Sequence, residues 1–205
     1  MKDAQPVILG FDTSTSACRV AVLRGDQLLA AHSEDMTRGQ AERLMVLCQE
    51  ILAECELHTS DLSAVGVGIG PGNFTGIRIS VAAARGLALG LGIPAIGVSA
   101  FEALRFGIQG PCACAVDARR GQIYLQTFDD KGASKEPMLC TTDTLPSFEG
   151  PLIGQGDQDP HYPQAVSICH IAGTKLRSHK PRPAPLYIRP ADAAPARDTP
   201  PNRLT

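Results

Sequence analysis

Residues 68–80, GIGPGNFTGIRIS, constrain the fold of this chain more than any other segment. The stretch before and into this run, Ala64 to Ile69, is nearly all apolar and leads directly into glycines and a proline. Such an uninterrupted apolar run is typical of a strand buried on both faces. The residues that follow include few large polar side chains. The pattern therefore predicts a strand, a tight loop and a helix, with the loop facing either an anion or the surface of another chain.

The glycine loop, Gly70-Pro71-Gly72, precedes a helix that we expect to begin near Thr75. A helix N-terminus attracts anions, typically by about 0.3–1 kcal/mol per charge. The loop has no lysine and does not match GxxxxGK[ST], which excludes a P-loop, and no acidic residue follows it as in a dinucleotide-binding GxGxxG motif. The alternative is that the glycines serve tight turning and close packing.

The helix expected over residues 77–91 carries two apolar stripes. One consists of the larger or aliphatic positions Ile77, Val81, Ala84 and Ala88. The other is made mostly of small residues, namely Ile79, Ala82, Ala83, Gly86 and Gly90. A helix that is apolar nearly all round is buried on more than one side. We favour a second subunit as the cover of the small-residue stripe over a central helix in a single core.

The composition excludes several classes of protein. The net charge of −2 and the absence of Trp argue against a general nucleic-acid surface or a base-stacking platform. We find no signal peptide and no run of about 18 apolar residues, so we expect a cytoplasmic protein without a membrane span. The seven scattered cysteines include no CxxC pair. Reduced, mostly buried thiols are therefore favoured over a zinc or redox site.

Two segments about 105 residues apart share one pattern. GFDTSTSACRVAVL and AVDARRGQIYLQTF both indicate a strand, an aspartate, a small or polar turn and a second strand. A repeat of this size predicts two related lobes, although the identity is weak enough to arise by chance. We expect an N-terminal lobe over 1–106, a smaller C-terminal lobe over 107–190 and a disordered tail over 191–205. Strands are predicted at 6–11, 18–23, 27–31, 64–69, 93–98, 112–116, 122–128 and 186–188, and helices around 44–55, 77–91 and 99–106.

The repeated aspartates, Asp12 and Asp117, are candidate binding residues. In two-lobed folds an aspartate that ends the first strand can help to hold the metal or phosphates of a nucleotide, and the adjacent turn supplies N–H donors. Alternatively, both aspartates hydrogen-bond their own turns. The predicted nucleotide or phosphate loop consists of Asp12, Thr13, Ser14, Gly70, Gly72 and Asp117.

No catalytic residue or metal ligand is predicted. The five histidines form neither HExxH nor HxxxH, and the GxSxG motif of a nucleophile elbow is absent. A basic stretch without acidic residues lies near the C-terminal end, and a solvated face is favoured over an RNA contact there. Its members are Lys175, Arg177, Lys180, Arg182 and Arg189.

Four segments resemble those of the bacterial TsaB (YeaZ) family of tRNA threonylcarbamoyladenosine biosynthesis proteins. They are ILGFDTSTSACRVAVL, GIGPGNFTGIRIS, VDARRGQIY and PLYIRP, and the resemblance covers residues 6–130 best. It implies an α/β, two-lobed actin/Hsp70-like (ASKHA, ribonuclease H-like) fold with a mixed sheet and helices. It also implies a non-catalytic paralogue of the TsaD/glycoprotease (M22-like) family. Such a scaffold would support formation of N6-threonylcarbamoyladenosine at position 37 of tRNAs reading ANN codons.

The resemblance further implies the partners. These are a TsaD-like catalytic subunit and a TsaE-like ATPase, with tRNA contacted indirectly and a homodimer through the same helix when the chain is free. No cofactor is expected for the isolated chain, whereas ATP and Mg²⁺ are expected in the assembled complex. Two departures from the family pattern are Asn73, where Ser is usual, and Gln40, where many relatives have His. The interface residues implied are Gly76, Ile79, Ala82, Ala83, Gly86 and Gly90. The alternative function is an independent nucleotide-dependent enzyme, an ATPase, kinase or metallopeptidase of the same fold.

Overall fold

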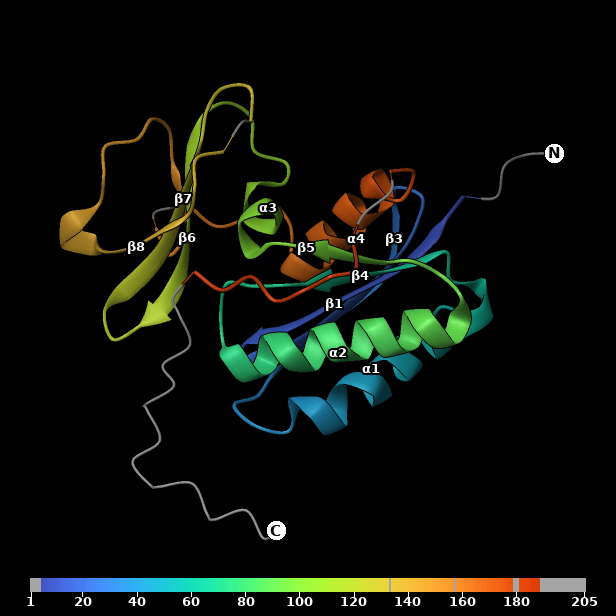
Figure 1. The fold of residues 1–205 in the computed structure, drawn as a ribbon. Helices are drawn as coiled ribbons and strands as arrows, with labels where there is room; N and C mark the ends of the chain where they lie inside the picture. The colour runs from blue at the N-terminus through green and yellow to red at the C-terminus, as the bar shows by residue number, and fades with distance from the viewer. Residues whose placement is uncertain (1–4, 133, 157, 179–180, 189–205) are drawn as a thin grey trace, which may run out of the picture.

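The central element of the fold is a five-stranded mixed sheet, seen in a computed structural model that describes residues 5–132, 134–156, 158–178 and 181–188 (Figure 1). Its strand order is β3-β2-β1-β4-β5. The first strand pairs antiparallel with β2 and parallel with β4, so the chain crosses over between β3 and β4. The strands are β1 (Val7–Thr15), β2 (Ala17–Arg24), β3 (Gln27–Asp35), β4 (Ala64–Gly68) and β5 (Ala95–Val98).

Helices cover both faces of this sheet (Figure 1). The helices α1 (Gln40–Glu54) and α2 (Phe74–Leu91) pack on one face, and α4 (Gln164–Lys175) packs on the other. Successive side chains of β1 point to opposite faces, because strand side chains alternate. Leu9 therefore lies in the core beneath α1 and α2, whereas Ile8 lies beneath α4. This double burial explains why the central strands are apolar throughout.

The helix expected around residues 44–55 is confirmed as α1. Its apolar residues recur at helical spacing, and those that are buried form one stripe on the sheet. The same holds for the first stripe of α2, whose members Ile77, Val81, Ala84 and Ala88 are all buried. The buried residues of α1 are Leu44, Leu47, Cys48, Ile51 and Leu52.

A second, four-stranded sheet repeats the topology of the first. Its order is β8-β7-β6-β9, with β6 antiparallel to β7 and parallel to β9. The short helix α3 (Ala100–Arg105) connects the two sheets, and its Phe101 packs with Cys112 and Cys114 of β6. The strands are β6 (Cys112–Arg119), β7 (Gln122–Phe128), β8 (Met138–Thr141) and β9 (Leu152–Gly154). The predicted repeat and the two-lobed actin/Hsp70-like α/β fold are therefore confirmed.

The C-terminal part of the chain differs from the sequence-based expectation. The turn-rich segment 129–163 contains β8, β9 and a 3₁₀ turn, Thr142–Thr144, and it is followed by the unpredicted helix α4. The strand predicted at 186–188 is wrong: Leu186 donates one hydrogen bond to the Ile69 carbonyl at 2.8 Å, without strand pairing. The helix α4 returns to pack on the first sheet. The division of the chain into two lobes at residue 106 stays a prediction. The predicted disordered tail, 191–205, lies outside the described residues, as do positions 180 and 189 of the basic stretch.

Candidate functional site

Asp12 lies near the end of β1 and is fully buried. Its Oδ1 accepts hydrogen bonds from the Ser14 backbone amide at 2.9 Å and from the Ser14 hydroxyl at 2.8 Å. Its Oδ2 has no hydrogen-bond partner among the described residues and lies against Gly68, where a Cβ would come within 1.8 Å of it. Burial raises the pKa of Asp12, and the Ser14 hydrogen bonds offset this only in part. Asp12 thus hydrogen-bonds its own turn, as in the alternative to a nucleotide-binding role.

The glycine loop packs directly on the end of β1. A Cβ on Gly72 would lie 2.5 Å from the carbonyl oxygen of Ser14, and the Asn73 amide donates to that oxygen at 2.6 Å. A Cβ on Gly76 would lie 1.8 Å from the carbonyl oxygen of Thr13. The Thr13 hydroxyl in turn donates to the Gly76 carbonyl at 2.7 Å. Close packing, the alternative to a phosphate cradle, therefore accounts for the glycines at 72 and 76.

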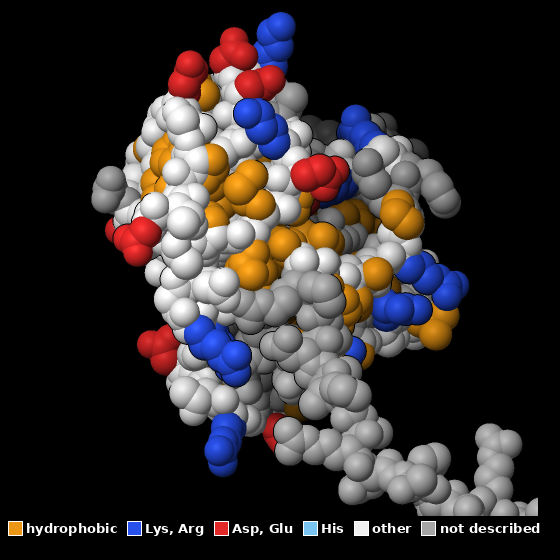
Figure 2. Space-filling model, turned by 60° about the vertical axis from the view of Figure 1, so that its left-hand side comes forward, with side chains coloured by type: hydrophobic (Ala, Val, Ile, Leu, Met, Phe, Trp, Pro, Cys, Tyr) orange, Lys and Arg blue, Asp and Glu red, His pale blue; other side chains and the backbone are white. Residues whose placement is uncertain are grey.

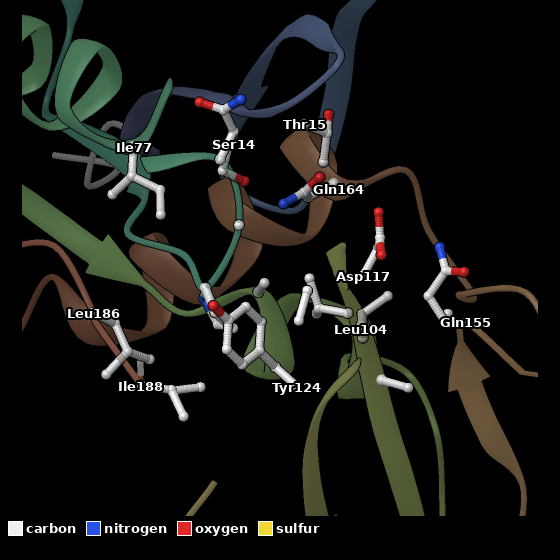
Figure 3. Close-up of a pocket in the computed structure, with 18 of the residues that line it drawn as sticks. Ser14, Thr15, Ile77, Leu104, Asp117, Tyr124, Gln155, Gln164, Leu186 and Ile188 are labelled. Carbon is white, nitrogen blue, oxygen red and sulfur yellow. The ribbon is translucent and has the colours of Figure 1, made fainter. Parts of the chain in front are cut away.

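A cleft of about 940 Å³ lies between the two sheets, at the ends of β1 and β6 (Figure 3). Ser14 and Thr15 line it from the first sheet, and Asp117 and Tyr124 line it from the second (Figure 3). The space-filling view shows hydrophobic side chains gathered across the middle of one face, with charged residues around them (Figure 2). A concave site of this size with mixed walls is suited to a small ligand.

The cleft brings together only half of the predicted nucleotide-binding residues. Ser14, Gly72 and Asp117 line it, whereas Asp12, Thr13 and Gly70 do not. Asp117 is exposed, and its Oδ1 accepts a hydrogen bond from the Arg119 amide at 2.8 Å. The two aspartates of the repeat therefore sit in different surroundings: one is buried in the sheet and the other faces the cleft.

Positive charge dominates the cleft. Among the described residues, its lining includes three arginines, Arg19, Arg78 and Arg119, and a single carboxylate, that of Asp117. Arg19 donates hydrogen bonds to the neutral side chains of Thr15 and Gln164. Sequence reasoning missed these arginines, because no local spacing indicates that side chains from β2, α2 and the end of β6 converge. The arrangement favours an anionic ligand over a cation.

No metal centre is present in the part of the chain that the structure describes, where no three His, Cys, Asp or Glu side chains are grouped to hold an ion. All seven cysteines are free thiols, and only Cys55 is not fully buried. Burial raises the pKa of Cys18 to about 11 and that of Cys48 to about 12. These thiols have the environment of small core residues.

The second stripe of α2 is largely open to solvent. Ala82, Gly86 and Gly90 are exposed, and a Cβ on either glycine would meet no atom within 4 Å. Ile79 and Ala83 are half-buried at its edge. Gly76 differs, because it is buried against β1 and is not part of the exposed face.

The exposed face makes α2 unusually apolar for a surface helix. Residues 74–91 form an 18-residue window of mean hydropathy 1.3, of which 33% is buried. This meets the length and composition threshold for a membrane span, although the window contains Arg78 and Arg85 and is not the uninterrupted apolar run that the sequence analysis looked for. A helix that packs its other face on a sheet, as α2 does, passes the same test, so the finding is weak evidence for a membrane.

Comparisons with known proteins indicate the family of this chain. Residues 32–153 match the family model described as TsaD: tRNA N6-adenosine threonylcarbamoyltransferase. The chain is 30% identical over 195 residues to the tRNA threonylcarbamoyladenosine biosynthesis protein TsaB of Bacillus subtilis, covering 87% of this chain and 84% of that protein. It is 39% identical over 122 residues to TsaB of Escherichia coli, covering 57% of this chain but only 52% of that protein.

A solved structure also matches over most of the chain. It is a Pseudomonas aeruginosa protein described as similar to peptidase YEAZ, with a TM-score of 0.75 and 26% sequence identity. The match covers 90% of this chain and 100% of that one. Sequence and fold thus agree over most of the chain, and the chain belongs to the TsaB (YeaZ) family.

Proposed function

We propose that this chain is a non-catalytic scaffold subunit of the complex that forms N6-threonylcarbamoyladenosine at position 37 of tRNAs reading ANN codons. Its relatives named TsaB are biosynthesis proteins of this modification, which supports the pathway. The observation that carries the scaffold role is the exposed small-residue face of α2, formed by Ala82, Gly86 and Gly90. Small residues let a partner backbone approach closely and bury apolar surface that is otherwise in water.

The partner in this proposal is a TsaD-like catalytic subunit. A second copy of this chain covers the same face when that subunit is absent, and a TsaE-like ATPase joins the assembled complex. The tRNA is bound by the complex, without a dedicated surface on this chain.

The state of Asp12 supports a non-catalytic role. A carboxylate that holds a metal-bound nucleotide must face the ligand. Asp12 is buried and does not line the cleft. We therefore assign any ATP and Mg²⁺ requirement to the assembled complex.

The substitution Ala82→Glu tests the interface. A glutamate placed on the exposed face should weaken binding of the TsaD-like subunit of the same organism at least about tenfold, because its larger side chain would hold the partner backbone away and its carboxylate would pair with Arg78 and Arg85 on the same helix. Calorimetry on the purified pair measures the affinity. The matched control is Ala31→Glu, since Ala31 is also an exposed alanine, on the edge strand β3. Wild-type affinity for Ala82→Glu would rule out this face as the interface.

The isolated chain separates the scaffold from an independent enzyme. We expect neither ATP hydrolysis nor micromolar binding when the chain is titrated with ATP and Mg²⁺. Turnover that is lost on substitution of Asp117, the carboxylate lining the cleft, would instead establish a nucleotide-dependent enzyme.

A further inference from the structure

The first turns of α2 carry an aromatic cluster around one arginine. The Cζ of Arg78 lies 3.7 Å from the centre of the Phe74 ring, within the range of a cation–π contact. Arg78 Nε donates a hydrogen bond to the Tyr187 hydroxyl at 2.9 Å, and the two rings are 5.1 Å apart. The guanidinium plane is thus held by two side chains, of which Tyr187 lies 109 residues away in the chain.

This cluster lines the cleft and is exposed, although it is largely aromatic. Phe74 is 40% exposed and Tyr187 is 44% exposed. Within the described residues, the two terminal nitrogens of Arg78 make no hydrogen bond or ion pair. A fixed guanidinium with free terminal donors is preorganised for a bidentate contact with a carboxylate. Exposed aromatic and arginine side chains are also the residues that most often dominate binding energy at protein interfaces.

The cluster continues into the exposed face of α2. Residues spaced three and four apart share one face of a helix. Five exposed residues of α2 form one such stripe, in which apolar residues alternate with two arginines seven positions apart. The stripe consists of Phe74, Arg78, Ala82, Arg85 and Leu89.

The charges on this stripe disfavour a second copy as its occupant. The helix contains two arginines and no acidic residue. Two copies packed antiparallel about Ala82 would bring Arg78 of one opposite Arg85 of the other, and like charges placed opposite one another are repulsive. The neighbouring helix α1 offers little negative charge to offset these arginines, because most of its carboxylates are already in ion pairs.

Two of the three carboxylates on α1 are already paired. Glu50 accepts from Arg43 at 2.5 Å, and Glu54 contacts His32 at 2.5 Å. Among the described residues this leaves Glu42 as the one carboxylate of α1 without a partner. A single such carboxylate per copy cannot balance the two arginines of the facing copy.

We propose that Arg78, oriented by Phe74 and Tyr187, is a specificity determinant that selects a partner helix bearing two carboxylates over a second copy of this chain. This rests on the proposed function, and it specifies the chemistry of the partner surface. Because Arg78 and Arg85 are seven residues apart, about 10.5 Å along the helix, the two carboxylates lie at a similar spacing on the partner. Small or aliphatic residues lie between them, opposite Ala82.

Charge reversal at Arg78 tests the proposal with the TsaD-like subunit. Arg78→Glu should weaken binding about tenfold or more and should flatten the salt dependence of the affinity, because a charge pair is lost. Arg78→Lys keeps the charge but loses the planar guanidinium, so its affinity should fall between that of wild type and that of Arg78→Glu. Tyr187→Phe, which removes only the oriented hydroxyl, should weaken binding a few-fold. The matched control is Arg177→Glu, since Arg177 is exposed just beyond α4 on the opposite face of the sheet.

Self-association of the same variants completes the test. Sedimentation should show that the wild-type chain associates with itself more weakly than with the TsaD-like subunit, and that high salt strengthens self-association while weakening the heteromeric pair. If Arg78→Glu binds the subunit like wild type while Ala82→Glu does not, the role of Arg78 is wrong and the proposed function stands. If the wild-type chain does not bind the subunit at all, both the proposed function and this inference are wrong. Self-association tighter than heteromeric binding would also overturn the inference.

Discussion

The Cβ position of Gly76 lies 1.8 Å from the carbonyl oxygen of Thr13, closer than any real Cβ contact. The first turn of α2 therefore rests on the backbone of β1, and only glycine allows this approach. The contact is reinforced by the Thr13 hydroxyl, which donates to the Gly76 carbonyl at 2.7 Å. Residue 76 thus belongs to the junction of sheet and helix and is not part of the exposed face of α2.

Replacing Gly76 with alanine should lower the free energy of unfolding by about 1–3 kcal/mol, because backbone must shift to accept the methyl group. Urea denaturation followed by circular dichroism measures this. Gly86→Ala is the matched control: a Cβ there meets no atom within 4 Å, and alanine is the better helix former by about 1 kcal/mol. The pair should therefore change stability in opposite directions, and a stabilising Gly76→Ala would contradict the packing described.

Asn73 is the N-cap of α2, where its Oδ1 accepts from the Gly76 amide at 3.0 Å. Asn73→Ala should destabilise the protein by about 0.5–2 kcal/mol, since a helix N–H loses its partner. Asn73→Ser retains an acceptor and should be close to neutral. Equal losses for the two variants in thermal denaturation would show that the cap is not what residue 73 contributes.

Asp12 should make stability fall as the pH rises. Its pKa is raised in the folded protein, so the folded state holds this proton more tightly than the unfolded state does. Its contribution is greatest below the unfolded pKa and is lost as the pH rises through the folded pKa. The variant Asp12→Asn does not titrate at this position. Its unfolding free energy, measured relative to that of wild type by urea denaturation, should therefore increase as the pH rises above about 4, the ordinary pKa of an aspartate. A pH-independent difference would show that Asp12 titrates alike in both states.

Cys55 should be the thiol that reacts first with an aromatic disulfide reagent in the native protein. It is half-buried, whereas the other six cysteines are buried. Burial raises the pKa of Cys48 and Cys169, which slows their reaction because the thiolate is the nucleophile; it raises the pKa of Cys55 too, so Cys55 is set apart by its exposure. Absorbance should report one fast equivalent at mildly alkaline pH and all seven thiols after denaturation. Cys55→Ser should remove the fast phase, and a fast phase that survives would assign it to another cysteine.

Local patterns in the sequence were sufficient for the elements that bury one periodic face. The stripe of α1 and the strand, loop and helix around Gly72 could be predicted, because spacing and backbone requirements are properties of neighbouring residues. The helix α4 could not be predicted in this way. Most residues of α4 are buried, on more than one side of the helix, and they are mainly small. Its sequence therefore lacks the periodic alternation of apolar and polar residues that indicates an amphipathic helix.

The position of α4 also depends on residues far away in the chain. A Cβ on Gly10 would lie 2.4 Å from the sulfur of Cys169, and one on Gly66 would lie 3.0 Å from Ala172. These glycines in β1 and β4 let the helix approach the sheet closely, a role that their own neighbours in the sequence do not indicate.

By itself, the sequence determined the repeated strand pattern, the glycine loop and a helix with two apolar stripes, because these follow from short-range periodicity. The tertiary structure alone decided which stripe is exposed, that Asp12 is buried while Asp117 faces the cleft, and that Arg78 meets Tyr187. Each of these outcomes depends on contacts between segments far apart in the chain. Their burial and partners are set only when the two sheets and the returning C-terminal segment pack together.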